Sequence, residues 1–317
     1  MVSRWFAIPA WHILVGAGPG RSRFEYSSAV APPTGISDVD AILARVPMFD
    51  SARKVGAELL SGGLTNSNYL LTVDDERFVV RVSTANTDIL GIDRAREAAA
   101  LRRAGVAGIA PETVAFLLPE GHSVTRFLDS AKPLSQAEFS RPETIDRVGT
   151  RLLEIHGLDP IIGTFDPYAD IRRWLATIDE RGVARPERLG VVLEMVEHTR
   201  TSRSGRGQGK VLCHNDPYHL NVLDDGKLWF VDWEYAGMGD PMFDLAGAGY
   251  SFEPAGRERL LQAYFGDVTA EHRTDLVEMI RVFLCWNVAW SMMQITSSSV
   301  DHDYRRFAEE LLDITPM

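Results

Sequence analysis

Cysteine is scarce in this chain of 317 residues, which contains Cys213 and Cys285 and no other cysteine. Two thiols cannot make a disulfide framework, and neither cysteine belongs to a pattern with the spacing of metal ligands. We therefore expect two buried thiols in a protein of a reducing compartment. This predicts a cytoplasmic location.

Long apolar runs are also missing from the sequence. No stretch reaches the roughly 18 apolar residues that a membrane-spanning helix needs, so we expect no membrane span. Near the N-terminus an apolar run is interrupted by Pro9 and His12, which makes a poor signal peptide. We interpret residues 1–36 as a loose N-terminal extension, and the sequence leaves open whether they belong to the native protein.

Positive charge is in deficit, because 33 lysines and arginines stand against 44 aspartates and glutamates, which gives a net charge of −11. An acidic protein repels a phosphate backbone, so we expect no nucleic-acid partner. A small cationic substrate would instead be attracted. Hydrophobic residues make up 45% and charged residues 24%, as in ordinary globular proteins. The length predicts one bilobed unit or two domains.

Two regions of different character make up the rest of the chain. In the first region the sequence predicts a short helix at 39–49, strands within 57–73, 77–83 and 112–128, and one main helix at 92–105. The second is mainly helical, with helices expected at 143–158, 168–182, 186–200, 270–297 and 301–313. The order predicts an α+β, bilobed, protein-kinase-like fold. Its small β-rich N-lobe, residues 37–128, would bind nucleotide, and its larger C-lobe, 129–317, would carry the catalytic loop and the substrate pocket.

The stretch CHNDPYHLN, residues 213–221, has the spacing H-x-D-x-x-x-x-N. Phosphoryl transfer from a nucleotide to an alcohol needs this set of side chains. Asp216 supplies a carboxylate beside the attacking hydroxyl, as catalytic base, and we expect His214 to brace the catalytic loop. Asn221 and Asp232, which ends the next strand, offer the oxygen ligands that Mg²⁺ prefers.

The phosphates of a nucleotide need a close backbone and a cation. Gly62 and Gly63 form a turn in SGGLTNSNY, and the polar residues that follow include Thr65 and Asn66. Such a turn often only closes a hairpin. Arg81 lies on an apolar strand, where a charge is costly unless it is paired, and Glu97 on the following helix is its natural partner. The alternative is an arginine of an edge strand that faces water.

Three segments, SGGLTNSNY, HNDPYHLN and VDWEYAG with the later FDLA, together resemble the choline/ethanolamine kinase family within the aminoglycoside-phosphotransferase-like kinases. The resemblance spans roughly residues 50–300. It implies ATP and Mg²⁺ as cofactors, with Asp216 as base and Asn221 and Asp232 as metal ligands. It also implies that Arg81 binds nucleotide phosphates and pairs with Glu97, and that Asp244 is structural. Adenine would contact the backbone of Thr125, Arg126 and Phe127.

The substrate end of the site rests on aromatic residues, because a quaternary ammonium group is held by aromatic faces and a nearby anion. Trp286 and Trp290 lie at positions i and i+4 of one helix face. The family's W-x-x-W-S-x-x-Q segment matches at Trp290 and Gln294, whereas Asn287 stands where the other tryptophan is expected. Tyr235 matches a cage aromatic of the family, and Glu234 supplies negative charge.

The leading hypothesis is an ATP-dependent kinase for choline, ethanolamine or a similar amino alcohol. A second hypothesis keeps the chemistry and changes the alcohol, for example to thiamine or an aminoglycoside. A third is a nucleotide-binding protein without catalysis, against which the intact Asp216, Asn221 and Asp232 argue. The absence of H-R-D and D-F-G motifs argues against a protein kinase. The sequence does not decide between choline and ethanolamine as substrate. It also leaves the pathway and the formation of a homo-oligomer open.

Overall fold

The computed structural model describes residues 32–60, 66–83, 87–204, 209–298 and 302–317. Most of the predicted N-terminal extension, and the turn with Gly62, Gly63 and Thr65, lie outside these residues. The chain divides into two compact units. The first comprises Glu112–Asp129 and the described part of Met1–Thr84, and the second the described parts of Ala85–Pro111 and Ser130–Met317.

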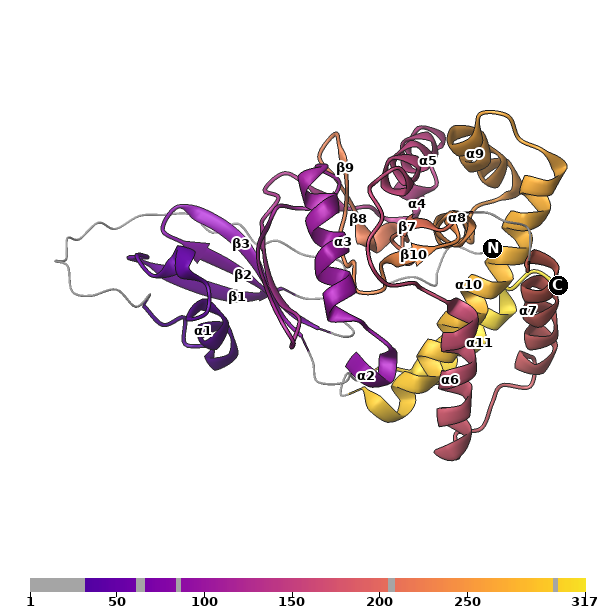
Figure 1. The fold of residues 1–317 in the computed structure, drawn as a ribbon, viewed down its shortest axis with the longest axis horizontal. Coiled ribbons are helices and arrows are strands. Elements are labelled where there is room, and N and C mark those ends of the chain that lie inside the picture. Colours follow the sequence, from indigo (N-terminus) through magenta and orange to yellow (C-terminus); the bar gives the residue numbers. More distant parts are fainter. Residues whose placement is uncertain (1–31, 61–65, 84–86, 205–208, 299–301) are drawn as a thin grey trace. The chain divides into compact units, whose positions relative to one another are not determined.

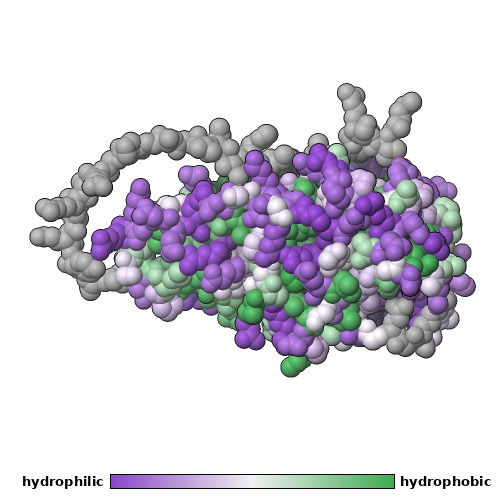
Figure 2. All heavy atoms as spheres, turned by 90° about the horizontal axis from the view of Figure 1, so that it is seen from above, coloured by the Kyte–Doolittle hydropathy of each residue, from purple (hydrophilic) through white to green (hydrophobic). Residues whose placement is uncertain are grey.

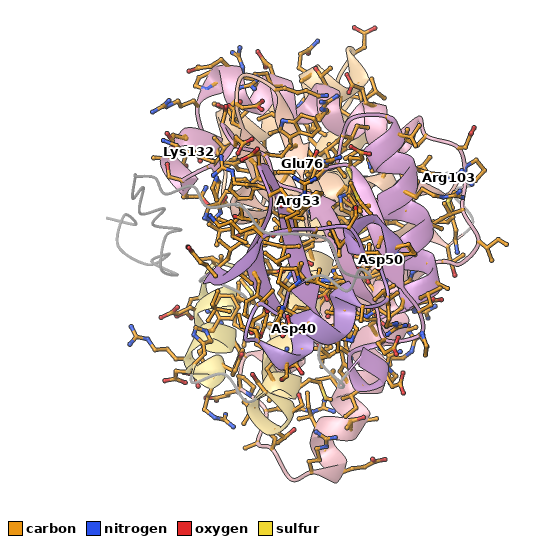
Figure 3. The ribbon with its side chains drawn as sticks, turned by 90° about the vertical axis from the view of Figure 1, so that its left-hand side faces the viewer. Asp40, Asp50, Arg53, Glu76, Arg103 and Lys132 are labelled. Carbon is orange, nitrogen blue, oxygen red and sulfur yellow. The ribbon has the colours of Figure 1, made fainter. Side chains whose placement is uncertain are left out.

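The first unit is an antiparallel sheet with strand order β1-β2-β3-β5-β4. Its strands are β1 (Val55–Leu60), β2 (Ser67–Val73), β3 (Glu76–Val82), β4 (Thr113–Leu117) and β5 (His122–Arg126). Phe78 and Val80 of β3 alternate with less buried residues and enter the core, as the two-residue period of a strand requires. The charged residues Asp50, Arg53 and Glu76 stay exposed (Figure 3).

The prediction of one helix at 39–49 is wrong in one respect, because the structure has two shorter helices in this region. Helix α1 (Ser37–Leu43) ends, and the 3₁₀ helix η1 (Pro47–Phe49) follows. Pro47 explains the break, since the residue before a proline avoids the helical region, and Val46 is extended. Phe49 then packs edge-to-face on Phe78 at 5.2 Å between ring centroids, which closes the core of this unit.

Helix α3 (Arg94–Val106) belongs to the second unit, although we expected it within the N-lobe range. Asp93 caps it by accepting a hydrogen bond from the N–H of Arg96. The side chain of Arg96 crosses over to donate to the carbonyl of Thr164 at 2.7 Å. A Cβ at position 237 would lie 2.9 Å from Cδ of Arg96. Gly237 therefore allows the arginine side chain to pass close to the backbone. The predicted lobe boundaries remain a proposal.

Helices dominate the second unit, as predicted (Figure 1). They comprise the short α2 (Thr87–Leu90) and α4 (Gln136–Phe139) and the longer α5 (Pro142–His156), α6 (Pro167–Glu180), α7 (Leu189–Arg203), α8 (Pro241–Gly249), α9 (Pro254–Phe265), α10 (Ala270–Ser297) and α11 (Tyr304–Asp313). Helices α6, α7, α8 and α11 pack on α10. Helix α10 has the length and apolarity of a membrane span, but 78% of its apolar window is buried, as in a core helix.

Two small sheets in the second unit hold the segments that matter for function. Strand β7 (Val211–Cys213) pairs with β10 (Gly237–Gly239), and β6 (Lys132–Pro133), β8 (Val222–Asp224) and β9 (Leu228–Phe230) form the other sheet. The 3₁₀ helix η2 (His219–Asn221) leads into β8. The H-x-D-x-x-x-x-N segment therefore spans the end of β7 and η2. The predicted α+β class is confirmed.

The face of the molecule in Figure 2 carries mostly hydrophilic residues, and its hydrophobic residues form separate small areas. Exposed large hydrophobic side chains come from different elements, such as Leu59 of β1, Val106 of α3 and Leu153 of α5. Scattered residues of this kind are normal on a protein surface and need no partner.

Candidate active site

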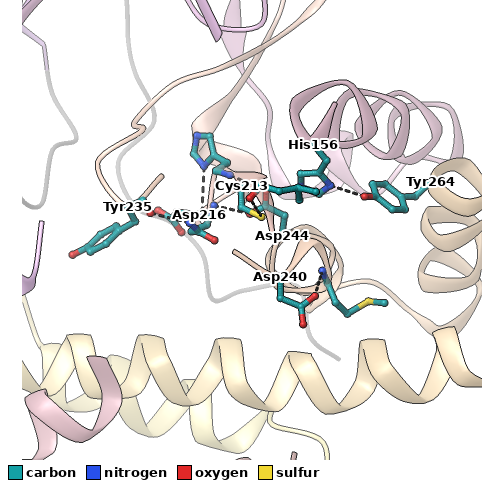
Figure 4. Close-up of polar contacts among 11 residues, drawn as sticks. His156, Cys213, Asp216, Tyr235, Asp240, Asp244 and Tyr264 are labelled. Carbon is teal, nitrogen blue, oxygen red and sulfur yellow. Dashed lines mark hydrogen bonds and ion pairs between the residues drawn. The ribbon is translucent and has the colours of Figure 1, made fainter. Parts of the chain in front are cut away.

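The segment that we predict to be the catalytic loop follows β7 and carries Asp216 (Figure 4). Asn215 has a positive φ of 68°, in the left-handed region that asparagine tolerates better than most residues. The N–H groups of His214 and Asn215 consequently donate to the two carboxylate oxygens of Asp244, at 2.8 and 2.6 Å. Asp244 lies in the first turn of α8, where the helix dipole favours a negative charge. Its contacts agree with the structural role that the family resemblance implies.

His214 braces this loop rather than facing a reactant. Its Nε2–H donates to the carbonyl of Val231 at 2.9 Å, and its Nδ1 accepts from the N–H of Asp216 at 3.2 Å. The ring is fully buried and packs edge-to-face against Trp233. Burial lowers the pKa of His214 to about 4, so the imidazole is neutral at pH 7 and holds both segments in place.

Asp216 lies among other carboxylates. Its Oδ2 accepts a hydrogen bond of 2.9 Å from Nδ2 of Asn221, which also donates to the Asp216 carbonyl at 3.0 Å. Burial, followed by the charges of Asp232 and Glu234, raises the pKa of Asp216 well above its ordinary value. Crowded carboxylates of this kind are typical of functional sites, where a cation relieves their repulsion.

The oxygen donors near Asp216 fit a magnesium ion. Because Nδ2 of Asn221 donates to Asp216, its Oδ1 points elsewhere, and within the described residues this oxygen accepts no hydrogen bond. Asp232 is exposed and, like Asn215, has a positive φ, 64°. An amide oxygen and a carboxylate beside Asp216 are hard ligands of the type that Mg²⁺ takes. The assignment of Asn221 and Asp232 as metal ligands stays a prediction.

Glu234 has a partner that sequence reasoning missed. Its carboxylate lies 3.6 Å from Nη1 of Arg94, and the same nitrogen lies 2.6 Å from Glu97. All three side chains are buried. The spacing i, i+3 between Arg94 and Glu97 was the available signal. Arg94 therefore offsets part of the negative charge that we expected Glu234 to present to a substrate.

The aromatic residues expected at the substrate end do come together. The rings of Tyr235 and Trp286 are 4.8 Å apart and perpendicular, and Nε1–H of Trp290 donates to the Tyr235 hydroxyl at 2.9 Å. Trp286, however, is 2% exposed and also packs on Phe165, Trp174 and Phe243. This burial favours a packing role for Trp286. The part of these residues in a cation cage stays a prediction.

The neighbours of these aromatic residues on α10 and α6 complete the substrate end. Gln294, one turn after Trp290, is buried and accepts a hydrogen bond from Ser297. Asn287 donates to the carbonyl of Phe283. Asp170 of α6 accepts from Nε1–H of Trp286 at 3.2 Å, and burial raises its pKa. No local pattern marks Asp170, because its partner is 116 positions away.

A further residue near Asp216 was missed as well. Burial, together with the charges of Asp216 and Asp232, raises the pKa of Tyr218 well above its ordinary value. Its position two residues after Asp216, inside the motif, was the signal that sequence reasoning passed over. Tyr250 at the end of α8 has its pKa raised by burial and by Asp216, and no local pattern marks it.

The described residues expected to bind nucleotide lie in the first unit, apart from Glu97. Arg81 is buried and donates through Nη2 to the carbonyl of Gly121 at 2.9 Å. Its predicted pairing with Glu97 would join the two units and stays a prediction. Asn66 is buried just before β2.

The segment expected to contact adenine leaves the end of β5. Thr125 lies opposite Val79 of β3 in the sheet. Arg126 pairs with Glu76 at 2.6 Å, and the N–H of Phe127 donates to the carbonyl of Arg77. The Arg126 side chain and the Phe127 backbone thus have structural partners, and adenine binding by the backbone stays a prediction.

Residues 56–276 match the phosphotransferase enzyme family. Protein LicA of Haemophilus influenzae is 27% identical over 267 residues, which are 80% of this chain and 76% of that protein. A choline/ethanolamine kinase family protein from Mesorhizobium loti shares the fold with a TM-score of 0.74 and 28% identity, over 87% of this chain and 92% of that one. The choline kinase LicA of Streptococcus pneumoniae has the same fold at 22% identity, with a TM-score of 0.73, over 88% and 99% of the two chains.

These similarities confirm the predicted protein-kinase-like fold and a phosphotransferase that acts on an alcohol. The match covers both units, from the first strand of the small sheet to the start of helix α10. The chain therefore belongs to the phosphotransferase enzyme family, within which it is similar to choline and choline/ethanolamine kinases.

Proposed function

We propose that this protein transfers the γ-phosphoryl group of ATP to the hydroxyl of choline, ethanolamine or a similar amino alcohol. One observation carries the proposal. Nδ2 of Asn215 donates to the carbonyl of Tyr235 at 2.9 Å and so ties the catalytic loop to the aromatic group. The carboxylate that would accept the hydroxyl and the rings that would receive the ammonium group are thus held by one buried side chain.

In this proposal Asp216 orients the attacking hydroxyl and takes its proton. Burial raises the pKa of Asp216, which makes it a stronger base than an exposed carboxylate. Asn221 and Asp232 would hold Mg²⁺, which when bound offsets the negative charge of the phosphates. His214 keeps the loop in place. Arg81, Asn66 and the segment Thr125 to Phe127 would bind the nucleotide, and a LicA of the same fold has been solved in complex with AMP.

The substrate is proposed to be a cation because its surroundings are aromatic and acidic. Tyr235 and Trp290 present rings, and Asp170, Asp216 and Glu234 surround Tyr235 with negative charge. The net charge of −11 acts in the same direction at longer range. A quaternary ammonium group donates no hydrogen bond, so it depends on rings and fields of this kind. We also propose a cytoplasmic location, in keeping with two buried free thiols.

The alternative is a kinase of another small alcohol with the same machinery. The burial of Trp286 favours it, because a tryptophan closed in by other rings cannot offer its face to a cation. Spectinomycin phosphotransferase shares the fold, with a TM-score of 0.59. A nucleotide-binding protein without catalysis is disfavoured by the intact Asp216, Asn221 and Asp232.

A panel of acceptors tests the proposal. The purified protein is incubated with ATP and Mg²⁺, and ADP release is followed with choline, ethanolamine, thiamine, an aminoglycoside and homoserine. We expect the fastest release with choline or ethanolamine. Release with thiamine or the aminoglycoside alone would favour the alternative alcohol. No release above the rate without acceptor, across the whole panel, would contradict the proposed function.

A further inference from the structure

The turn between β4 and β5 contacts the end of strand β3, where Arg81 is located. The backbone ladder between β3 and β5 ends with the pair of Arg81 and Ser123. Beyond this pair, the N–H of Ser83 donates to Nδ1 of His122 at 3.1 Å, and the Ser83 hydroxyl donates to the carbonyl of Gly121 at 2.7 Å. Contacts through side chains therefore continue the hydrogen bonding of β3 past its last backbone pair with β5.

The carbonyl of Gly121 receives a second donor, because Nη2 of Arg81 lies 2.9 Å from it. One oxygen thus binds both the guanidinium group and the Ser83 hydroxyl. Gly121 has a φ of 84°, in the left-handed region that glycine adopts without steric cost. The guanidinium carbon also lies 5.8 Å from the ring centre of Phe116 in β4. The turn that holds the end of β3 therefore also orients Arg81.

His122 can accept the N–H of Ser83 only as a neutral ring. A neutral imidazole has one N–H and one acceptor nitrogen, and because Nδ1 accepts, the proton is on Nε2. Protonation makes Nδ1 a second donor, which then faces the N–H of Ser83. Burial lowers the pKa of His122, so the ring is neutral and the contact is intact at pH 7.

Charged groups of the neighbouring elements act on this ring in both directions, after the larger influence of burial. Glu120 of the same turn and Asp38 of α1 raise the pKa of His122. Arg45, which follows α1, and Arg81 lower it. Protonation of the ring would therefore repel the guanidinium group of Arg81 as well as break the contact with the strand.

We propose that His122 is a positioning residue of the nucleotide site: together with Gly121 it fixes the end of β3 and thereby the guanidinium group of Arg81. The proposal rests on the proposed function, in which Arg81 binds the phosphates of ATP. His122 acts through the strand, because its ring nitrogen binds the backbone of Ser83. Its loss should therefore weaken the binding of ADP and leave the binding of adenosine, which has no phosphate, unchanged.

Replacing His122 with leucine or glutamine tests this. Glutamine offers a carbonyl oxygen as acceptor and does not titrate, whereas leucine has no acceptor. Calorimetry measures the Kd for ADP with Mg²⁺ and the Kd for adenosine. In His122→Leu we expect the Kd for ADP to rise about fivefold, the usual net effect of one hydrogen bond. In His122→Gln it should stay close to the wild-type value. Asp75→Asn, exposed in the turn before β3, is the control.

Two results of this experiment would overturn the proposal. The first is an unchanged Kd for ADP in His122→Leu. The second is an equal loss of affinity for ADP and adenosine, because that pattern indicates general damage to the sheet. The segment expected to contact adenine begins at Thr125, near the end of β5, whereas His122 begins this strand.

The pH dependence of binding gives a test that avoids a disruptive substitution. We expect the Kd for ADP of the wild type, divided by that of His122→Gln, to be close to one above pH 6.5. This ratio should rise as the pH falls below that value, because the wild-type ring takes up a proton and releases Ser83. The titration of ADP itself cancels in the ratio. A ratio that stays constant with pH would contradict the positioning role.

Amide hydrogen exchange at Ser83 separates this proposal from the proposed function, because it needs no ligand. Exchange should be faster in His122→Leu than in the wild type and should stay slow in His122→Gln. Unchanged exchange in His122→Leu overturns the positioning role. A wild type that binds neither ADP nor ATP, with the expected exchange at Ser83, contradicts the proposed function instead.

Discussion

The carboxyl group of Asp216 is held by Asn221 and crowded by Asp232 and Glu234. Sequence reasoning found the first three of these residues because their spacing is local and chemically specific. It assigned His214 to a bracing role, and both ring nitrogens do bind backbone atoms. It missed Asp170, whose partner Trp286 only the folded chain brings near, and it missed the contact of Arg94 with Glu234 for the same reason.

Asp216→Asn tests the base. The amide keeps the size of the side chain and its contact with Asn221 but cannot take a proton. We expect kcat to fall on the order of 1,000-fold, within the range that general bases contribute. ATP binding, measured by calorimetry, should stay close to the wild-type value. Asp225→Asn, exposed in the turn before β9, is the control. A kcat within a factor of about two of the wild type would rule Asp216 out as the base.

His214 makes stability depend on pH. Its pKa is about 4 in the folded protein against 6.5 for an ordinary histidine, so between these values the unfolded chain binds the proton and the folded one does not. The stabilisation is complete above pH 6.5 and is lost as the pH falls toward 4. As the pH falls across that interval, we expect the free energy of unfolding to decrease by about 3 kcal/mol because of this residue.

Urea denaturation at several pH values measures this effect. In His214→Gln the decline between pH 6.5 and 4 should be shallower than in the wild type by that amount. His198→Gln, which replaces an exposed histidine of α7, should decline like the wild type. Parallel curves for the wild type and His214→Gln would contradict the assignment of a neutral, buried imidazole.

Helix α3 shows what happens at the scale of an element. The alanine-rich sequence and the glycine at position 105 predicted a helix at 92–105, and α3 runs from Arg94 to Val106. Its membership of the second unit was not predictable, because it depends on Arg94 and Arg96 reaching Glu234 and Thr164. Helices α8 and α9 were not predicted at all. Helix α8 is buried on every side and contains glycine, so it lacks an amphipathic period.

The buried charges of α3 give a prediction about stability. Arg94→Met removes the guanidinium beside Glu97 and Glu234, which are both buried. Breaking a buried ion pair from one side costs about 3–5 kcal/mol, and we expect the free energy of unfolding to fall by that amount. Chemical denaturation measures it. Arg102→Met, exposed on the same helix, should change stability by less than about 0.5 kcal/mol. A small effect at Arg94 would mean that other groups hold the two carboxylates.

At the scale of the whole molecule, the bilobed α+β fold and the catalytic segment were predictable because both depend on local patterns. The helix expected at 270–297 is α10 (Ala270–Ser297), since its apolar length and the capping Thr269 are visible in the sequence. The substrate end was less predictable. Whether a tryptophan of α10 packs in the core or faces a ligand depends on residues of α6 and α8, and Trp286 packs against both.

The rings of Tyr235 and Trp290 predict that choline and ethanolamine respond differently to a substitution. Trp290 is partly exposed and is fixed by its bond to Tyr235. In Trp290→Leu we expect the KM for choline to rise about tenfold, since a cation–π contact is worth roughly 1 kcal/mol or more, and the KM for ethanolamine to rise less. Steady-state kinetics with both acceptors measure this. Trp229→Leu on β9 is the control. Equal changes for the two acceptors would argue against a cage around the methyl groups.

Asn215 meets two demands at once. Its backbone is left-handed, and its side-chain amide joins the catalytic loop to the segment of Tyr235. Glycine would satisfy the first demand and lack the amide. Aspartate tolerates the conformation but offers no donor and adds a charge beside Asp244. A change at Asn215 should therefore disturb Asp216 and the rings around Tyr235 together, whereas a change in one of those rings leaves the loop bonded to Asp244.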